Sequence, residues 1–392
     1  MSHRTPHSGL SRRGFIQGAS LSALAVGSAS LLSSCGTDAA TVSKDDCKST
    51  DKSDSEQEIV FSNWPLYIDP IKAKNVSTLE AFEKSTGITV DYTADVNDND
   101  SFYAKVSPQL ADCKSTGRDT FALTDWMAAR MIKLGWIQEL DHANMPNVDA
   151  NLLNWFKTPA WDPDRKYSVP WQAGMTGIVY NSELTDPVAS FEDLLMRPDL
   201  KGKVTVLSEM RDTMTFMLLL QGADPEDFTS EEYSAAIGDL KGAVDAGQIR
   251  RFTGNDYIDD LKAGNVVACE SWSGDISQLG DDKFKWIKPK EGFAVWADNM
   301  IVPNLATHKT NVEKLINYYY DPKVAAQLAA WNYYVCPVRG AQDFMAEFDK
   351  SAVDNPLIFP DESGLDAGQD FMVLDSGQDK EYQQMFNEVQ SG

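Results

Sequence analysis

An alternation of strand and helix patterns at the start of the folded part constrains this chain most. Residues 58–64 follow a strand pattern, residues 79–84 follow a helical pattern that ends at Gly87, and residues 88–92 follow a second strand pattern. Glycine tolerates the left-handed conformation that closes many helices, so Gly87 is a natural end. The order strand, helix, strand predicts a βαβ unit with parallel strands. We therefore expect an α/β fold.

The two patterns continue along the rest of the chain. Further strands are predicted at residues 120–124, 167–171, 176–181, 203–207, 266–270 and 292–300. Helices are predicted around 102–106 and at 125–135, 191–195, 212–220, 231–246, 257–263, 311–320, 322–331 and 382–389. Asp125 is placed to cap the helix that follows it.

The length of the chain predicts two lobes. A chain of 392 residues exceeds one ordinary hydrophobic core. We expect the first lobe at residues 57–172 and 297–342, and the second at 173–296 and 343–392. The short strands at 167–171 and 176–181 are expected to carry the chain out of the first lobe.

Charge restricts the class of ligand. The formal net charge is −24, and residues 1–34 contain three arginines and no acid or lysine, so the remainder carries −27. Such a balance argues against nucleic acid as a partner, because phosphate backbones are bound by lysine and arginine. It favours the approach of a cationic ligand but is also common in proteins that are acidic for solubility.

The N-terminus has the pattern of a bacterial lipoprotein signal. Arg12 and Arg13 form a twin-arginine pattern, a mildly apolar stretch runs over residues 19–32, and Cys35 follows. The apolar stretch is too short and too rich in serine and glycine to span a membrane. We predict a signal peptide at 1–34, a lipid on Cys35 and a flexible tether at 35–56, with the mature protein anchored outside the cytoplasmic membrane.

The remaining cysteines and histidines predict no metal site. Four cysteines remain after Cys35, none in a CxxC or Cys/His spacing, and after processing His142 and His308 are the only histidines. One or two disulfides are compatible with an oxidising compartment, and their pairing stays open. The cysteines concerned are Cys47, Cys113, Cys269 and Cys336.

Aromatic and acidic side chains recur where predicted strands end. Trp64 follows the first strand, Thr124 and Trp126 close another, Trp272 follows a third, and Glu209 and Asp212 follow the strand at 203–207. Open α/β sheets bind ligands at strand ends. The chain contains no nucleophile elbow, P-loop or dinucleotide motif.

Trp296 and Asp298 sharpen the expected ligand. Two residues apart in a strand, they point to the same side of the sheet. An indole face attracts a positive charge by about 0.5–2 kcal/mol, and a carboxylate beside it accepts the N–H bonds of an ammonium. Core packing is the alternative interpretation of the pair.

Several motifs in order resemble one known family, the substrate-binding proteins of spermidine/putrescine ABC transporters, within the class of periplasmic-type binding proteins. The resemblance covers most of residues 57–350. It rests on residues 62–67, 100–105, 168–171, 177–181, 200–204 and 296–298.

The resemblance implies a bilobal periplasmic-binding-protein fold of type II, which closes on its ligand by a hinge. It implies no enzymatic activity and no cofactor, and it implies a monomer that delivers a polyamine to an ABC permease. The aromatic box would be formed by Trp64, Trp126, Trp272, Trp296 and Tyr334, and the ammonium groups would be taken by Glu209, Asp212 and Asp298, with Thr124 as a hydrogen-bond partner.

The chain departs from the family pattern at three places. Pro65 stands where many members have a hydroxyl residue, Glu209 and Asp212 occur in the reverse order of acid types, and Trp126 replaces what is often a tyrosine. These departures bear on the identity and length of the amine.

Two alternatives stay open at this point. A binding protein for another cargo would use the tryptophans for a sugar, or the tyrosines at 318–320 or 333–334 for Fe(III). A secreted glycoside hydrolase would use Glu209 and Asp212 as an acid/base pair, although a spacing of three residues does not fix the separation that such a mechanism needs.

Overall fold

The computed structural model of this protein describes residues 47–70, 76–372 and 374–392. The predicted signal peptide, the twin arginines and Cys35 lie outside the described residues. Within the described part, no helix combines the length and the apolar character needed to cross a membrane.

The predicted βαβ unit is confirmed. Strands β1 (Glu58–Asn63) and β2 (Thr89–Ala94) are parallel neighbours joined through helix α1 (Thr78–Thr86). Ser77 and Glu80 form a reciprocal capping box at the start of α1, and Gly87 closes the helix at φ 75°. The sequence therefore specifies both ends of the first helix.

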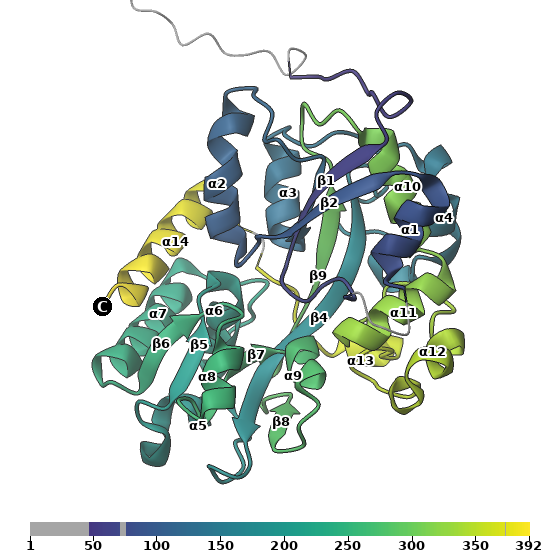
Figure 1. Cartoon of the computed structure of the whole chain (residues 1–392). Coiled ribbons are helices and arrows are strands. Elements are labelled where there is room, and N and C mark those ends of the chain that lie inside the picture. The colour runs from purple at the N-terminus through teal and green to yellow at the C-terminus, as the bar shows by residue number, and fades with distance from the viewer. Residues whose placement is uncertain (1–46, 71–75, 373) are drawn as a thin grey trace, which may run out of the picture. The chain divides into compact units, whose positions relative to one another are not determined.

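One mixed sheet of nine strands runs through the structure in the order β2-β1-β3-β9-β4-β7-β5-β6, with β8 paired to β4 (Figure 1). The α/β class predicted from the sequence is confirmed. The remaining strands are β3 (Thr120–Thr124), β4 (Ser168–Asn181), β5 (Val204–Leu207), β6 (Ile249–Thr253), β7 (Ala268–Trp272), β8 (Phe284–Ile287) and β9 (Ala294–Ile301).

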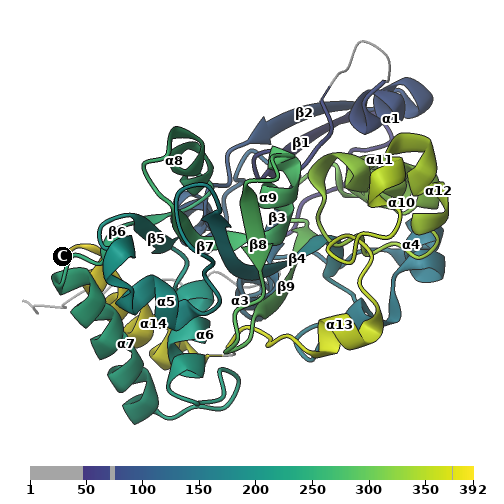
Figure 2. The same cartoon turned by 90° about the horizontal axis from the view of Figure 1, so that it is seen from below.

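Helices cover the sheet in two groups, one beside β1 and β3 and the other beside β5 and β6 (Figure 2). The first group includes α2 (Asn99–Ala111), α3 (Asp125–Lys133), α4 (Pro146–Asn151), α10 (Lys309–Tyr319), α11 (Pro322–Asn332) and α12 (Gln342–Phe348). The second includes α5 (Phe191–Met196), α6 (Met210–Leu220), α7 (Ser230–Asp245), α8 (Tyr257–Ala263) and α14 (Ser376–Gln390). Short helices α9 (Ser273–Leu279) and α13 (Glu362–Asp366) complete the set in the described residues.

The long antiparallel pair β4 and β9 connects the two halves of the sheet. The sequence predicts two short strands where the structure has the single strand β4, with an irregular register between Pro170 and Gln172. Proline lacks the N–H that a regular ladder needs, so the sequence pattern is interrupted where the strand bulges.

Two hydrophobic clusters divide the buried apolar residues. The first contains Phe61, Phe102 and Met345 and surrounds β1, β3 and β9. The second contains Phe216 and Phe386 and surrounds β5, α6, α7 and α14. The tail therefore contributes to both clusters, and the lobe boundaries expected from the sequence stay a prediction.

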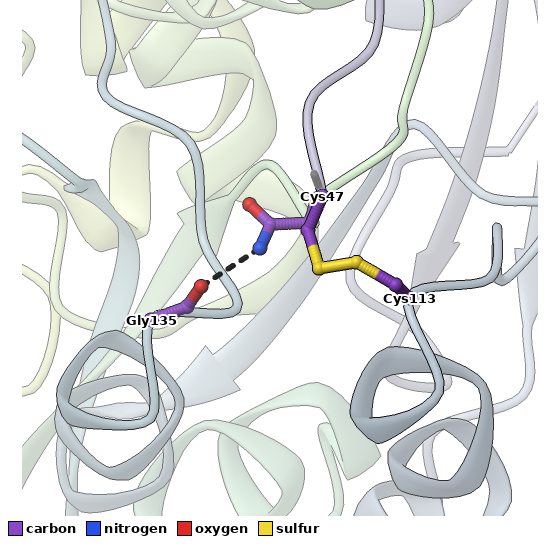
Figure 3. Close-up of a disulfide and its surroundings, with 4 residues drawn as sticks. Cys47, Cys113 and Gly135 are labelled. Carbon is purple, nitrogen blue, oxygen red and sulfur yellow. Dashed lines mark hydrogen bonds between the residues drawn. A yellow bond between two sulfur atoms is a disulfide. The ribbon is translucent and has the colours of Figure 1, made fainter. Parts of the chain in front are cut away.

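The end of the expected tether is held against the folded part. Cys47 forms a disulfide with Cys113 at the end of α2, with Cα atoms 5.2 Å apart (Figure 3). Ser53 is 2% exposed, and the Lys52 backbone N–H donates to the Thr307 carbonyl. The polar composition of residues 47–56 suggested a tether, but these contacts fix them.

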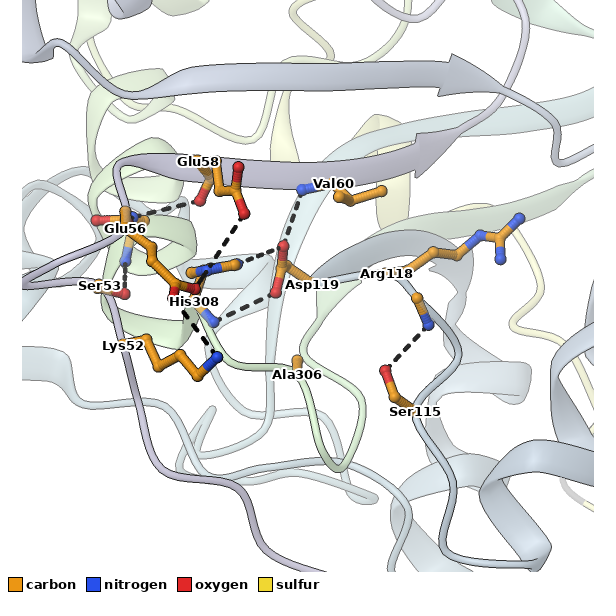
Figure 4. A network of polar contacts seen from close by, with 12 residues as sticks. Lys52, Ser53, Glu56, Glu58, Val60, Ser115, Arg118, Asp119, Ala306 and His308 are labelled. Carbon is orange, nitrogen blue, oxygen red and sulfur yellow. Dashed lines mark hydrogen bonds and ion pairs between the residues drawn. The ribbon is translucent and has the colours of Figure 1, made fainter.

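A charged network lies beside the same segment (Figure 4). The His308 ring contacts Asp119 through Nδ1 at 3.0 Å and Glu56 through Nε2 at 3.0 Å. Burial lowers the pKa of His308, but the bonds to the two carboxylates outweigh it and raise the pKa overall.

Cys269 and Cys336 are buried free thiols.

Replacing Cys47 and Cys113 together by serine is expected to lower the free energy of unfolding by about 2–4 kcal/mol, because the bridge restricts a long loop of the unfolded chain. Denaturant titration of oxidised protein measures the difference. Reducing agent should destabilise the wild type to the level of the variant and leave the variant unchanged. Equal stability of both oxidised proteins would contradict the bridge.

Candidate functional site

Eight of the nine predicted site residues line one cavity where strands from both halves of the sheet end. The free volume among its side chains is about 20 Å³, which holds about one water molecule. The residues predicted from the sequence and found there are Trp64, Thr124, Glu209, Asp212, Trp272, Trp296, Asp298 and Tyr334.

Five aromatic rings form a continuous wall of this cavity. Trp272 lies edge-on to Trp64 and Trp296, with ring centroids 5.9 and 6.4 Å apart, respectively. Tyr334 lies 5.8 Å from Trp296 and 5.0 Å from Tyr67. The faces of these rings are suited to surround an apolar chain or a cation.

Two glycines allow the rings to lie this close to the backbone. A Cβ atom at Gly174 in β4 would lie 2.5 Å from the Trp296 ring, and one at Gly274 in α9 would lie 2.4 Å from the Tyr334 ring. Real Cβ atoms do not come this near, so any other residue would displace the ring.

Asp298 lies in β9 opposite Thr124 of β3 and Gln172 of β4. Its Oδ1 accepts a hydrogen bond from the Thr124 hydroxyl at 2.8 Å, and its Oδ2 accepts one from the Tyr67 hydroxyl at 2.8 Å. Burial raises the pKa of Asp298 to about 7, although both hydroxyls oppose the change.

Asp212 lies in the first turn of α6. Its Oδ1 accepts hydrogen bonds from the Thr176 hydroxyl at 2.5 Å and the Trp272 indole at 3.1 Å. The Trp296 indole donates to the same Thr176 hydroxyl at 2.9 Å. Burial raises the pKa of Asp212 to about 6. Thr176 therefore connects an acid and a ring of the cavity.

Glu209 precedes α6 and contacts the start of α2. Both of its carboxylate oxygens accept hydrogen bonds from Asn99. Burial and then the neighbouring Asp212 raise the pKa of Glu209 well above its ordinary value. The acid is therefore buried but has polar partners.

No basic side chain in the described part of the chain forms an ion pair with these three acids. Arg211, next to Asp212 in sequence, pairs with Asp379 at 2.8 Å instead. Neutral hydroxyl, indole and amide groups are the donors seen around Glu209, Asp212 and Asp298. Buried charges are normally paired, so this cavity is suited to a ligand that brings positive charge.

Trp126 is the predicted site residue that the structure places elsewhere. Its ring lies under the Arg211 guanidinium, 3.9 Å from the ring centroid to the guanidinium carbon, and it lines a neighbouring cavity with Arg130. Helix α3 begins at Asp125, so Trp126 lies in its first turn, which directs the ring toward Arg211. Asp125 does not cap that helix as expected but accepts hydrogen bonds from Ala297 and Asn299 of β9.

Three residues of the cavity wall were not predicted as site residues: Tyr67, Asn255 and Phe371. Tyr67 lies in the motif at 62–67 and could have been found from its place after Trp64. Asn255 follows β6, a strand missed in the sequence. Phe371 lies in the irregular tail, where no pattern indicates its position.

A metal site was not expected. Glu56, Glu58 and His308 bring possible ligand atoms within 4.8 Å of one another, but His308 already pairs with both acids. The expected absence of a metal stays a prediction.

The raised acid pKa values predict that the ligand-free protein loses stability as pH rises. Between its ordinary value of 3.8 and its folded value of about 7, Asp298 holds a proton in the folded state that the unfolded chain lacks. The free energy of unfolding therefore falls as pH rises from about 4 to 7. Asp298→Asn should make this slope shallower, by up to about 1.4 kcal/mol per pH unit.

Denaturant titrations at pH 5, 6 and 7 measure this slope. The exposed Asp186 serves as a matched control, because Asp186→Asn removes the same formal charge. Other groups titrate alike in all three proteins, so the difference in slope belongs to Asp298. The same slope in Asp298→Asn and wild type would contradict the raised pKa.

Comparison with known proteins gives consistent matches over most of the chain. A family profile described as "Bacterial extracellular solute-binding protein" matches residues 77–359. The spermidine/putrescine-binding periplasmic protein of Escherichia coli K12 is 27% identical over 323 residues, which cover 81% of this chain and 87% of that protein. The putrescine-binding periplasmic protein PotF of the same organism is 28% identical over 322 residues, covering 76% and 82% of the two chains, respectively.

Solved structures share the fold. A putative spermidine/putrescine ABC transporter protein from Listeria monocytogenes aligns with a TM-score of 0.75 at 24% identity, over 85% of this chain and 99% of that chain. PotD from Streptococcus pneumoniae aligns with a TM-score of 0.69 at 22% identity, over 86% and 99%, respectively. The type II periplasmic-binding-protein fold expected from the sequence is confirmed.

Proposed function

This chain belongs to the family of bacterial extracellular solute-binding proteins. From this premise, we propose that it captures a polyamine, putrescine or spermidine, outside the cytoplasm and delivers it to an ABC permease. The family is one of solute-binding transport proteins, and we propose no catalysis. The names of the relatives agree with this ligand class.

One observation carries the proposal: three buried carboxylates, which have no basic partner among the described residues, share a cavity with six aromatic side chains. An ammonium donates charge-assisted hydrogen bonds to a carboxylate. The methylene chain between two ammonium groups packs against ring faces, and the rings themselves attract cations. A linear polyamine combines both features in one molecule.

The small cavity volume supports binding by closure. Room for about one water does not hold a four-carbon diamine, so the walls must separate when the ligand enters. The cavity residues come from elements in both halves of the sheet, and the paired strands β4 and β9 connect these halves. We propose these two strands as the hinge connection, which would make ligand capture and lobe closure one event.

The other functions receive less support from the site. The tyrosines at 318–320 do not favour an Fe(III) site, because the Tyr319 hydroxyl contacts Thr78 and the Tyr320 hydroxyl donates to the Pro170 carbonyl. A sugar would leave the three acids without positive charge. A hydrolase would need an accessible acid pair, whereas Glu209 is bound by Asn99.

Titration of the purified mature protein by calorimetry is expected to show binding of putrescine or spermidine with a dissociation constant below about 1 mM. Asp298→Asn should weaken diamine binding by about 100-fold, because an ammonium in the closed cavity would lose its charged acceptor. The loss should be smaller for a monoamine, which can use another acid.

Two controls accompany this titration. Asp186→Asn, an exposed change of the same charge, should leave binding unchanged. Trp296→Ala should weaken monoamines and diamines alike, since a ring contacts any amine. Absence of binding to either polyamine, together with wild-type behaviour of Asp298→Asn, would exclude the proposal.

We further propose that the mature protein is a monomer held at the outer face of the cytoplasmic membrane by a lipid on Cys35, after twin-arginine export. The order of the motifs in residues 1–35 supports the anchor and the export route.

Cys35→Ser is expected to move the protein from the membrane fraction to the soluble extracytoplasmic fraction, because it removes the sulfur that carries the lipid. Immunoblots of both fractions measure the change. Cys269→Ser, at a buried free thiol, is the control that should leave the distribution unchanged. A Cys35→Ser protein that stays in the membrane would refute the anchor.

A further inference from the structure

Asn99 connects two helices, α2 and α6, that pack in different hydrophobic clusters. It is the first residue of α2 and is fully buried. Apolar residues of α2 such as Phe102 pack in the first cluster, whereas α6, which begins directly after Glu209, packs in the second through Met214. The contact between Asn99 and Glu209 therefore joins both halves of the closed site.

Three N–H contacts from Asn99 hold the Glu209 carboxylate. The Asn99 backbone N–H lies 2.7 Å from Oε1, and Nδ2 lies 2.9 Å from both Oε1 and Oε2. The N–H at the start of a helix has no partner within the helix, and the helix dipole favours a negative charge there. Glu209 is thus bound at the N-terminus of α2.

Thr124 fixes the orientation of the Asn99 amide. The Thr124 backbone N–H donates to Asn99 Oδ1 at 3.1 Å, and Asn99 Nδ2 donates to the Thr124 hydroxyl at 2.8 Å. That hydroxyl donates in turn to Asp298. One buried chain of hydrogen bonds therefore runs from Glu209 to Asp298.

The three acids differ in how many hydrogen bonds their carboxylate oxygens already accept from the protein, and therefore in how many they can accept from a ligand. Both oxygens of Glu209 already accept amide hydrogen bonds, and Asn99 is not among the residues that line the cavity. Asp212 has donors on Oδ1, from Thr176 and Trp272. Asp298 accepts one hydroxyl on each oxygen.

We propose that Asn99 is a positioning residue that sets the number of ammonium groups the site accepts: it engages Glu209 as the closing contact, leaves Asp212 and Asp298 for the ligand, and thereby selects a diamine over a triamine. This inference rests on the proposed polyamine function. The third ammonium of a triamine would meet an acid that is already satisfied, so discrimination arises from a missing partner.

Calorimetric titrations with putrescine and spermidine test the inference on the mature protein. The wild type should prefer putrescine. Asn99→Ala frees the Glu209 side chain from two amide contacts and should lower the ratio of putrescine to spermidine affinity by about tenfold, the effect of hydrogen bonds to a charged group. In Asn99→Ala/Glu209→Gln this shift should disappear, because the freed acid is gone.

Asn144→Ala is the matched control. The Asn144 amide donates to the buried Glu313 carboxylate at 2.7 Å, away from the cavity, and its loss should leave the affinity ratio unchanged. Glu209→Gln alone should change both affinities alike. Thermal unfolding and circular dichroism identify any variant that fails to fold, in which case Glu209→Gln carries the test.

Several results would overturn the inference: a wild type that prefers spermidine, an unchanged ratio in folded Asn99→Ala, a shift that persists in the double variant, or a selective loss of spermidine in Glu209→Gln. Each of these leaves amine binding by the wild type intact. Failure of the proposed function is distinct, because the wild type would then bind neither amine.

Discussion

The burial of three carboxylates that have no basic partner within the described part of the chain is the constraint on which the site depends. Moving one ionised carboxyl group out of water costs several kcal/mol unless donors or an opposite charge replace the lost hydration. Neutral donors supply part of this replacement here: Tyr67 and Thr124 for Asp298, and Thr176 for Asp212. Each donor comes from a different element, so partial compensation also ties the elements together. A ligand cation would supply the remainder.

The sequence locates most of this arrangement because of where its strands end. Thr124 and Trp272 each close a short buried strand, and Trp64 directly follows strand β1. Parallel strands such as β1 and β3 end at the same edge, and β7, which runs antiparallel to β3, ends at the same cavity from the other half of the sheet. Residues far apart in sequence can therefore be assigned to one site. The period of a strand does the same for Trp296 and Asp298, which both line the cavity. The α/β class follows equally well from the alternating patterns.

Other parts carry no such signal. Strand β6 contains Arg250 and Arg251 in its centre, and both are exposed, so its apolar pattern is broken. Asn99 lies in a polar stretch that resembles a loop, and its role depends on a contact 110 positions away in sequence. Trp126 has the residue type and the place of a site residue, but the turn into α3 directs its ring to Arg211. Local sequence patterns do not determine the direction in which the side chains of a helix's first turn point.

The two glycines behind the Trp296 and Tyr334 rings help to set the width of the cavity. Gly174 and Gly274 do not line the cavity, yet Trp296 and Tyr334 can lie where they do because no side chain stands behind them. The width of the site is therefore set from its outer side, by backbone atoms. Related proteins could widen or narrow their range of ligands at such positions while every group that faces the ligand stays the same. Inspection of the lining residues alone would then miss the origin of the difference.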